Sequence, residues 1–435
     1  MSDLDRINDV LREGSPVLWE CLSPLGRRVV FPPDIPFQAA EARDTRYNAT
    51  IGQITDGDGR ALAVPPVEEA LSGLGPEARN QALLYSPVQG LAAVREAWRS
   101  WQRREVGEQV PSSLPLVTCG LTHGLSIAAD LFAGPGRAVL VTAPFWGNYR
   151  QTFEVRTGAR LRSAAAYLGG RLHPRALAEL AAQEPIGEPV VAILNFPSNP
   201  GGYMPSAEER AELVDSLVEA AEARPLVVLC DDAYAGLVYE QEIPTGSLFW
   251  DLVGRHERLI PVKVDGATKE FSLFGGRVGF LTFACAPDDP MAEALESKVK
   301  CLVRATVGSP VATSQVLLLE ALGRVGADRH VEVLRERLAR RYRRLRRALS
   351  QLDPELLGVL PCNAGCFALV ELPEGVDPEA ARRHLIAEHG TGLVAIAPRY
   401  LRIAFCSVRE DDLPALVRNL EQGVAELATR RSSAT

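Results

Sequence analysis

The stretch Gly266-Ala267-Thr268-Lys269-Glu270-Phe271-Ser272-Leu273-Phe274-Gly275-Gly276-Arg277-Val278-Gly279 carries one lysine and one arginine in a glycine-rich setting. The amine of Lys269 can condense with a carbonyl, and the guanidinium of Arg277, eight residues further on, can bind a phosphate through two hydrogen bonds. An aldehyde cofactor with a phosphate group needs both. The spacing therefore indicates a site for pyridoxal phosphate.

The composition is that of an ordinary globular chain, and it excludes some partners. The 435 residues are 46% hydrophobic, and about two or three domains fit this length. The net charge of −8 and the pI of about 5.5 disfavour nucleic acid and anionic lipid as partners. The N-terminal residues lack the basic start and apolar core of a secretion signal, and no apolar run approaches membrane-spanning length. We therefore expect a cytoplasmic protein with neither nucleic-acid nor membrane partners.

The cysteines give no sign of a metal centre. Eight are scattered along the chain without a Cys-x-x-Cys pair and without a histidine at ligand spacing. Cys362 and Cys366 are close in sequence, but two sulfurs without further ligands do not complete a zinc site. We expect buried, reduced thiols and no metal.

From about residue 110 onward, short β-branched apolar runs alternate with helical patterns. One predicted helix covers 206–223, with Ser206 as its N-cap and Glu208 and Glu209 in its first turn. This alternation predicts a largely parallel sheet with helices on both faces, and functional sites in such sheets form beyond the carboxyl ends of the strands. The predicted buried strands are 114–118, 138–141, 190–194 and 226–229.

After about residue 310 the pattern changes to a long helix over 331–352, followed by shorter strands near 367–371 and 401–405 and a closing helix from Asp411. We expect a second, smaller α+β domain. The predicted division is 1–55 for an N-terminal arm and part of the small domain, 56–310 for the large domain and 311–435 for the small domain. The arginine run between 335 and 347 alternates with apolar residues at helical spacing, which indicates a solvated helix face.

Two further motifs follow predicted strands. In Cys230-Asp231-Asp232-Ala233-Tyr234, two aspartates and a tyrosine lie just after the strand that ends at Leu229, where a carboxylate can hold a ring nitrogen protonated and the phenol of Tyr234 can donate to a ring oxygen. The alternative for Asp231 is a helix cap. Asn199, in Asn195-Phe196-Pro197-Ser198-Asn199-Pro200-Gly201-Gly202, is presented by a tight turn, which is also the simpler interpretation of that motif.

Taken in order, these three motifs resemble the class I and II aminotransferases of fold type I pyridoxal phosphate enzymes. The resemblance runs roughly from Asn48 to Phe405 and implies an α/β fold, with a large domain built on a mostly parallel sheet and a smaller α+β domain. It assigns Lys269 to the internal Schiff base with pyridoxal 5'-phosphate and Asp231 to the pyridine nitrogen. Asn199 and Tyr234 would then bind the ring oxygen.

The resemblance also assigns the other contacts of the cofactor. Trp146, in Ala143-Pro144-Phe145-Trp146-Gly147-Asn148-Tyr149, would stack on the ring, the alternative being a core tryptophan. Leu121 and Thr122, at a predicted helix start, would receive the phosphate together with Arg277. Many relatives carry serine where this chain has Gly266, and Thr268 would replace that contact.

Substrate and partner contacts follow from the same resemblance. Tyr85, in Tyr85-Ser86-Pro87-Val88-Gln89-Gly90, would reach the phosphate of a neighbouring subunit, which implies a homodimer with shared sites. Arg402 would bind the substrate α-carboxylate together with Gly52 and Asn199, the alternative being a structural ion pair. Arg304 is a candidate for binding a side-chain carboxylate, or is simply an exposed helical residue.

The implied reaction is transfer of an amino group from an L-amino acid, such as aspartate, glutamate or an aromatic one, to a 2-oxo acid by a ping-pong route. The freed Lys269 amine would move the proton. A β-elimination lyase on the same fold is the alternative. A cofactor-binding transcription regulator is disfavoured, because the motifs begin near Asn48 and leave too little chain for a DNA-binding domain.

Overall fold

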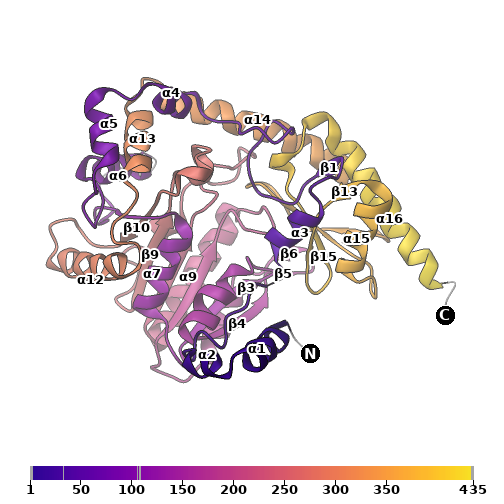
Figure 1. Ribbon diagram of the computed structural model, residues 1–435, viewed down its shortest axis with the longest axis horizontal. Helices are drawn as coiled ribbons and strands as arrows, with labels where there is room; N and C mark the ends of the chain where they lie inside the picture. Colours follow the sequence, from indigo (N-terminus) through magenta and orange to yellow (C-terminus); the bar gives the residue numbers. More distant parts are fainter. Residues whose placement is uncertain (1–2, 33, 105, 107–108, 433–435) are drawn as a thin grey trace.

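The computed structural model describes residues 3–32, 34–104, 106 and 109–432, and these form two main sheets of different size and two short two-stranded pairs (Figure 1). The larger sheet has seven strands in the order β2-β10-β9-β8-β7-β3-β4, and every pairing is parallel except those of β10, which runs antiparallel to β2 and β9. The predicted, largely parallel sheet is confirmed. Its strands are β2 (Leu116–Thr118), β3 (Ala138–Ala143), β4 (Arg160–Ala165), β7 (Val190–Asn195), β8 (Leu226–Asp231), β9 (Leu259–Asp265) and β10 (Gly279–Phe283).

Burial on both faces explains the continuous apolar runs. In β7, Val190 and Ala192 pack into one hydrophobic cluster, while Val191 and Ile193 pack into another on the opposite face. Ser206 caps α9 in a complete capping box, as the sequence predicts. The helices near this sheet are α6 (Ala92–Arg103), α7 (Leu121–Phe132), α8 (Ala176–Ala182), α9 (Ala207–Ala223), α10 (Leu248–Leu252) and α12 (Pro290–Thr306), together with the π-helical η1 (Arg150–Val155).

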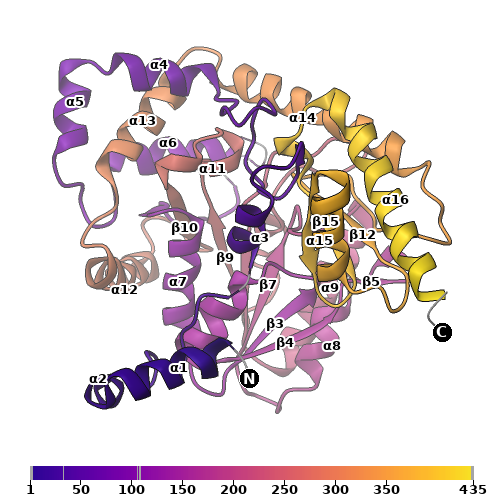
Figure 2. The same cartoon turned by 45° about the vertical axis from the view of Figure 1, so that its right-hand side comes forward.

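The smaller sheet has the order β11-β12-β15-β14 and is antiparallel throughout. Its core includes residues of the C-terminal helices, which lie beside it (Figures 1 and 2). A short parallel pair, β1 (Tyr47–Asn48) with β13 (Thr391–Gly392), joins the N-terminal part of the chain to this unit. The division at residues 55 and 310 stays a prediction. The elements are β11 (Gly358–Val359), β12 (Ala368–Glu371), β14 (Val394–Ile396), β15 (Tyr400–Ile403), α14 (Ala327–Leu349), α15 (Pro378–His389) and α16 (Leu413–Ser432).

The arginine-rich part of α14 is largely a solvated face, but Arg335 is half-buried and donates to the Val238 carbonyl oxygen. Arg341 is buried and donates to the carbonyl oxygens of Cys406 and Thr55, so it joins the helix to two distant segments. The neighbouring Arg343, Arg344 and Arg347 are exposed. Helical spacing shows which arginines share a face of the helix, but it does not show which of them donate hydrogen bonds to distant backbone carbonyls.

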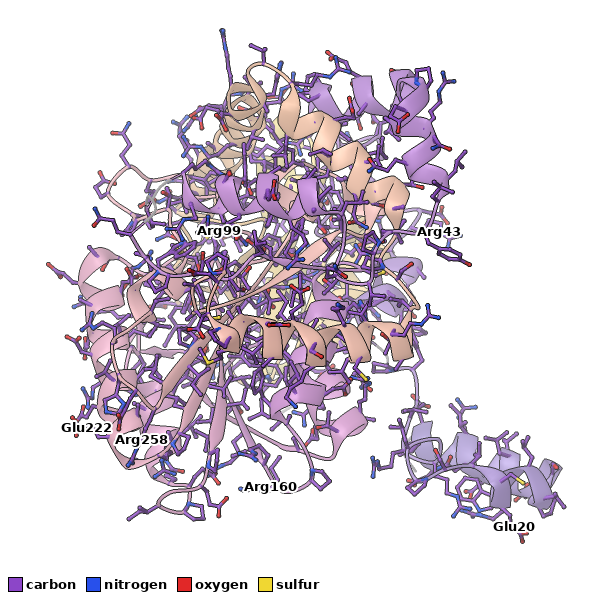
Figure 3. The ribbon with its side chains drawn as sticks, turned by 90° about the vertical axis from the view of Figure 1, so that its left-hand side faces the viewer. Glu20, Arg43, Arg99, Arg160, Glu222 and Arg258 are labelled. Carbon is purple, nitrogen blue, oxygen red and sulfur yellow. The ribbon has the colours of Figure 1, made fainter. Side chains whose placement is uncertain are left out.

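The N-terminal helices were not predicted. No residue is buried in α1 (Asp3–Gly14) or α2 (Pro16–Cys21), and Figure 3 shows the helical segment that carries Glu20 standing away from the rest of the molecule. A third helix, α3 (Ile35–Glu41), contacts β14 of the small sheet. Further on, α4 (Pro65–Gly73) and α5 (Pro76–Leu83) pack against α13 (Ala312–Gly323).

All eight cysteines are free, but the prediction that they are buried is wrong for Cys21 and Cys301, which are exposed on helices. None of the helices that the structure describes is long and apolar enough to cross a membrane.

Candidate active site

A cavity of about 240 Å³ lies where the carboxyl ends of β7 and β8 meet the start of α7 and the small sheet. It gathers residues from the whole length of the chain, because the ends of the parallel strands share one edge and the small sheet adds residues such as Arg402. The predicted residues that line it are Gly52, Leu121, Thr122, Trp146, Asn199, Asp231, Tyr234, Thr268, Lys269, Arg277 and Arg402.

The two aspartates after Leu229 have different environments. Asp231 is the last residue of β8 and lines the cavity, whereas Asp232 is buried against Lys263 and Ser247 in a structural ion pair. Burial raises the pKa of Asp231 to about 6, although a hydrogen bond from Tyr149 and the charge of Lys269 oppose this. Asp231 is therefore a buried carboxyl group in the wall of the cavity.

Two residues that hold this wall were not predicted. The Tyr149 hydroxyl donates to Asp231 Oδ2 at 2.5 Å. Asn195 Nδ2 donates to the Asp231 carbonyl at 3.0 Å, while Asn195 Oδ1 accepts from the Asn199 backbone at 2.7 Å. Both lie within motifs that the sequence singles out, but only the fold shows that they face Asp231. Burial raises the pKa of Tyr149 well above its ordinary value, so the phenol remains a donor.

The amine of Lys269 faces the cavity from α11 (Ala267–Glu270), the short helix after β9. Its Nζ lies 5.2 Å from the centroid of the Tyr234 ring. Burial lowers the pKa of Lys269 below its ordinary value, against the opposing charge of Asp231. A lowered pKa leaves more of the amine neutral, which is the form that attacks a carbonyl or accepts a proton.

One end of the cavity is suited to an anion. No side chain caps the start of α7, and the residue before it, Gly120, has a φ of 82°. A Cβ on Gly120 would lie 2.6 Å from Arg277 Nη2, so a side chain there would push the guanidinium away from this helix start. Thr268 Oγ1 is buried without a hydrogen-bond partner in the same cavity.

The glycine at position 266 has a packing reason. A Cβ there would lie 2.6 Å from the Val278 carbonyl oxygen and 2.8 Å from the Gly279 Cα. A serine would therefore require the backbone to shift. The unpartnered hydroxyl of Thr268 remains close by as a donor to an anion.

Arg402 extends into the opposite end of the cavity from β15 and is only 1% exposed. It donates to Asn199 Oδ1 at 3.0 Å and to the Thr50 carbonyl at 2.7 Å, while its Nε has no partner. The sequence predicts a carboxylate partner for this arginine, but within the described part of the chain none lies within 4.0 Å of it. Burial lowers its pKa to about 10, so the guanidinium still carries its charge at neutral pH.

Two predicted residues lie outside the cavity of this single chain. Tyr85 is 96% exposed after α5, and Arg304 is exposed near the end of α12. Their proposed roles depend on a second subunit. His123 is also outside the cavity, where its ring accepts from the Cys119 backbone and contacts Thr306.

A histidine cluster that the sequence did not indicate lies between α15 and α16. The ligand atoms of His384, His389 and Glu426 all lie within 4.8 Å of one another, and both rings hydrogen-bond the glutamate. The cluster is not part of the cavity described above.

Comparison with known proteins places this geometry in a family. A model of the family described as aminotransferase class I and II matches residues 48–420. The chain belongs to this family. As a class I and II aminotransferase it uses pyridoxal 5'-phosphate, and the activity that the sequence predicts is confirmed at this level. None of the comparisons favours the lyase alternative.

Individual relatives of the aminotransferase cover nearly its full length. It is 27% identical over 406 residues to the probable N-succinyldiaminopimelate aminotransferase DapC of Mycobacterium tuberculosis, covering 88% of this chain and 94% of the relative. It is 29% identical over 415 residues to the 4-dedimethylamino-4-oxo-anhydrotetracycline transaminase OxyQ of Streptomyces rimosus, covering 94% and 99%. Among solved structures, the Pyrococcus horikoshii kynurenine aminotransferase has the same fold, with a TM-score of 0.79 at 18% identity, covering 94% of this chain and 98% of that one.

The cavity of the aminotransferase fits the cofactor. The free start of α7, Arg277 and the unpartnered Thr268 hydroxyl would hold the phosphate, Asp231 would face the pyridine nitrogen, and Lys269 would meet the aldehyde. When bound, pyridoxal phosphate withdraws electrons from the substrate α-carbon, most strongly while its ring nitrogen is protonated.

Proposed function

We propose that this cavity transfers an amino group from an L-amino acid to a 2-oxo acid by a ping-pong route, with Arg402 binding the α-carboxylate and Lys269 moving the proton. One observation carries the proposal: Arg402 is buried, charged and without a carboxylate partner in the described part of the chain. A buried charge without a counter-ion is costly, and a substrate carboxylate would supply it.

The contacts of Arg402 also fix its orientation. Asn199 and the Thr50 carbonyl accept from the two terminal nitrogens, and the guanidinium carbon lies 4.3 Å from the centroid of the Phe367 ring. A guanidinium held at three points loses little further freedom when an anion binds. Gly52 lies on the same wall, where a Cβ would clash with the Phe367 ring.

Lys269 is suited to proton transfer because it is an amine of lowered pKa inside the same cavity. In this proposal it takes the proton from the α-carbon in one direction and returns it in the other half-reaction. Tyr234 lines the cavity beside it, and burial raises the pKa of its phenol well above the ordinary value, so it acts only as a neutral hydrogen-bond donor.

The proposal includes a homodimer with shared sites. It is supported by an exposed apolar group at the end of α5, where Leu83, Leu84 and Tyr85 are 85%, 60% and 96% exposed. Such a patch usually marks an interface. Sedimentation of the purified protein tests the dimer, and Tyr85→Ala in a dimeric enzyme should weaken cofactor binding if the phenol reaches a phosphate.

A cytoplasmic location also belongs to the proposal. Free thiols at all eight cysteines suit a reducing compartment. Cell fractionation with an antibody to the native protein would test this location.

The names of the relatives point to no single substrate. The relatives are named for N-succinyldiaminopimelate and for a tetracycline intermediate, which differ widely in shape. A donor with a side-chain carboxylate would need a further cation at the site, such as Arg304 supplied by a second subunit.

The decisive experiment uses the enzyme loaded with pyridoxal phosphate and mixes it with single amino acids in the absence of a 2-oxo acid. Transamination releases one equivalent of 2-oxo acid and leaves the amino group on the enzyme, whereas elimination releases ammonia over many turnovers. Lys269→Ala should abolish both half-reactions, while the exposed Lys298→Ala serves as the matched control. Retained turnover in Lys269→Ala would refute the proposed role.

A further inference from the structure

The charged groups of the cavity are all assigned once the cofactor and the α-carboxylate are placed. Arg277 faces the phosphate end, Asp231 and Lys269 serve the cofactor, and Arg402 binds the α-carboxylate in the proposal above. Beyond the residues proposed to hold the cofactor and the α-carboxylate, the wall includes the apolar Ile35, Ile51, Phe274 and Phe367 and the uncharged polar Gln53. Within the described residues of this chain, no charge remains in the cavity to pair with a second carboxylate.

A second cavity of about 650 Å³ adjoins the first. The two share Ile35 and Trp146, so these side chains form a common wall. Figure 2 shows α3, which begins at Ile35, between α7 and α15, beside the site. The wall of the second cavity is mainly apolar, and its lining residues are Val29, Val30, Phe31, Pro32, Asp34, Ile35, Pro36, Trp146, Asn148 and Gln151.

Large apolar side chains at this place are left in solvent. Phe31 is 72% exposed and Val29 is 49% exposed in the second cavity, and Ile51 is 49% exposed in the first. A group of exposed apolar side chains beside a polar reaction site is typical of a surface that a ligand covers.

The polar groups of the second cavity do not suit an anion. Asp34 is negative, and its carboxylate already accepts from the Ile35 backbone at 2.6 Å as the cap of α3. It lies close to Gly147, where a Cβ would be 3.5 Å from Asp34 Oδ2. The remaining polar residues, Asn148 and Gln151, are uncharged. An acidic side chain would meet a like charge here.

We propose that the two cavities form one substrate site, in which the second cavity takes a bulky apolar side chain of the amino donor between Ile35 and Trp146. This rests on the proposed transamination and names its substrate class: aromatic or large aliphatic amino acids rather than aspartate or glutamate. With the α-carboxylate on Arg402, the donor side chain would enter the apolar second cavity past Ile35 and Trp146.

The test measures kcat/KM of the loaded enzyme for phenylalanine, leucine, alanine and glutamate with one common 2-oxo acid. We expect phenylalanine to exceed glutamate at least tenfold. Ile35→Ala should lower the phenylalanine-to-alanine ratio of kcat/KM by about tenfold, since apolar groups in such pockets discriminate by roughly 10–200-fold. The matched control is Ile186→Ala, at an 88% exposed isoleucine outside both cavities, which should keep the ratio.

A binding measurement supports the test if a variant is unstable. Phenylpropionate and glutarate, which lack the amine, compete with the donor in the wild-type enzyme, and phenylpropionate should inhibit at lower concentration. A preference for glutamate and glutarate, with no effect of Ile35→Ala on the ratio, would overturn the substrate class and leave transamination intact. Failure of every donor to release a 2-oxo acid would refute the proposed function itself.

Discussion

Replacing Arg402 with methionine tests whether this arginine binds the substrate or only supports the structure. Burial lowers the Arg402 pKa to about 10 from the ordinary 12.5. At about 1.36 kcal/mol for each tenfold change in acidity, keeping this group charged costs the folded protein roughly 3 kcal/mol. Methionine removes that cost but leaves Asn199 Oδ1 and the Thr50 carbonyl without donors, at about 1–3 kcal/mol each. The two effects oppose each other, so we expect the free energy of unfolding to change by no more than about 3 kcal/mol.

Activity should change far more. Loss of a buried arginine–carboxylate pair costs about 3–5 kcal/mol, which corresponds to a fall in kcat/KM of about two to four powers of ten. Arg382 is the matched control, because it is also fully buried but contacts Glu41 and Glu379. Arg382→Met would leave those two partly exposed carboxylates without their counter-ion, so the free energy of unfolding should fall by about 1–3 kcal/mol. The same change should leave kcat/KM within threefold.

The assay is steady-state transamination beside urea unfolding of the same preparations. If Arg402→Met retained kcat/KM within tenfold, or lost stability as Arg382→Met does without a larger loss of activity, the arginine would be structural and the reasoning wrong.

Three further changes test the rest of the site. In the cofactor-free protein the pKa of Asp231 is raised to about 6, so the folded state favours the protonated carboxyl. Protonation of Asp231 therefore stabilises the folded protein below pH 4, and this contribution is lost as the pH rises through 6. Asp231→Asn should therefore be more stable than the wild type at pH 7 by up to roughly 3 kcal/mol, with no difference below pH 4 in urea unfolding. Tyr149→Phe removes a hydrogen bond that lowers the Asp231 pKa, so carboxyl titration by NMR should show a higher value; an unchanged one would contradict the contact. Gly120→Ala should cost about 1–3 kcal/mol, because a φ of 82° with a ψ of 169° suits glycine alone, and should also raise the Kd for pyridoxal phosphate, whereas Gly136→Ala, at a φ of 81° but with open space, should cost only stability.

Much of the large sheet could be predicted because its strands are buried on both faces, which leaves unbroken apolar runs such as 190–194 and 226–229. The motif residues at the ends of those strands are brought together for the same reason. The antiparallel direction of β10 gives no such signal, because burial looks alike in either direction. The choice between Asp231 and Asp232 came from the resemblance, and the structure shows why: Lys263 pairs with the second of them.

Other parts of the site depend on contacts that no local pattern shows. Ile35 lies far from the motifs in sequence and reaches the cavity only because α3 packs against β14. The roles of Tyr85 and Arg304 stay predictions, because one chain does not contain the neighbour on which they depend. The helices α1 and α2 were not predicted, and neither buries a residue against the rest of the described chain.

The antiparallel pairing of β10 with β9 bears on whether the enzyme accepts pyridoxal phosphate or unphosphorylated pyridoxal. Both ends of the segment 266–278 are tied to adjacent strands, with Asp265 paired to Phe280, so the amine of Lys269 and the guanidinium of Arg277 lie on one short connection of fixed length. The length of this connection would therefore set the distance between the group that meets the aldehyde and the group that holds the phosphate. If Lys269 and Arg277 have the roles proposed for them, unphosphorylated pyridoxal would meet only Lys269, and the insertion of a single residue between the two would separate the amine from the guanidinium.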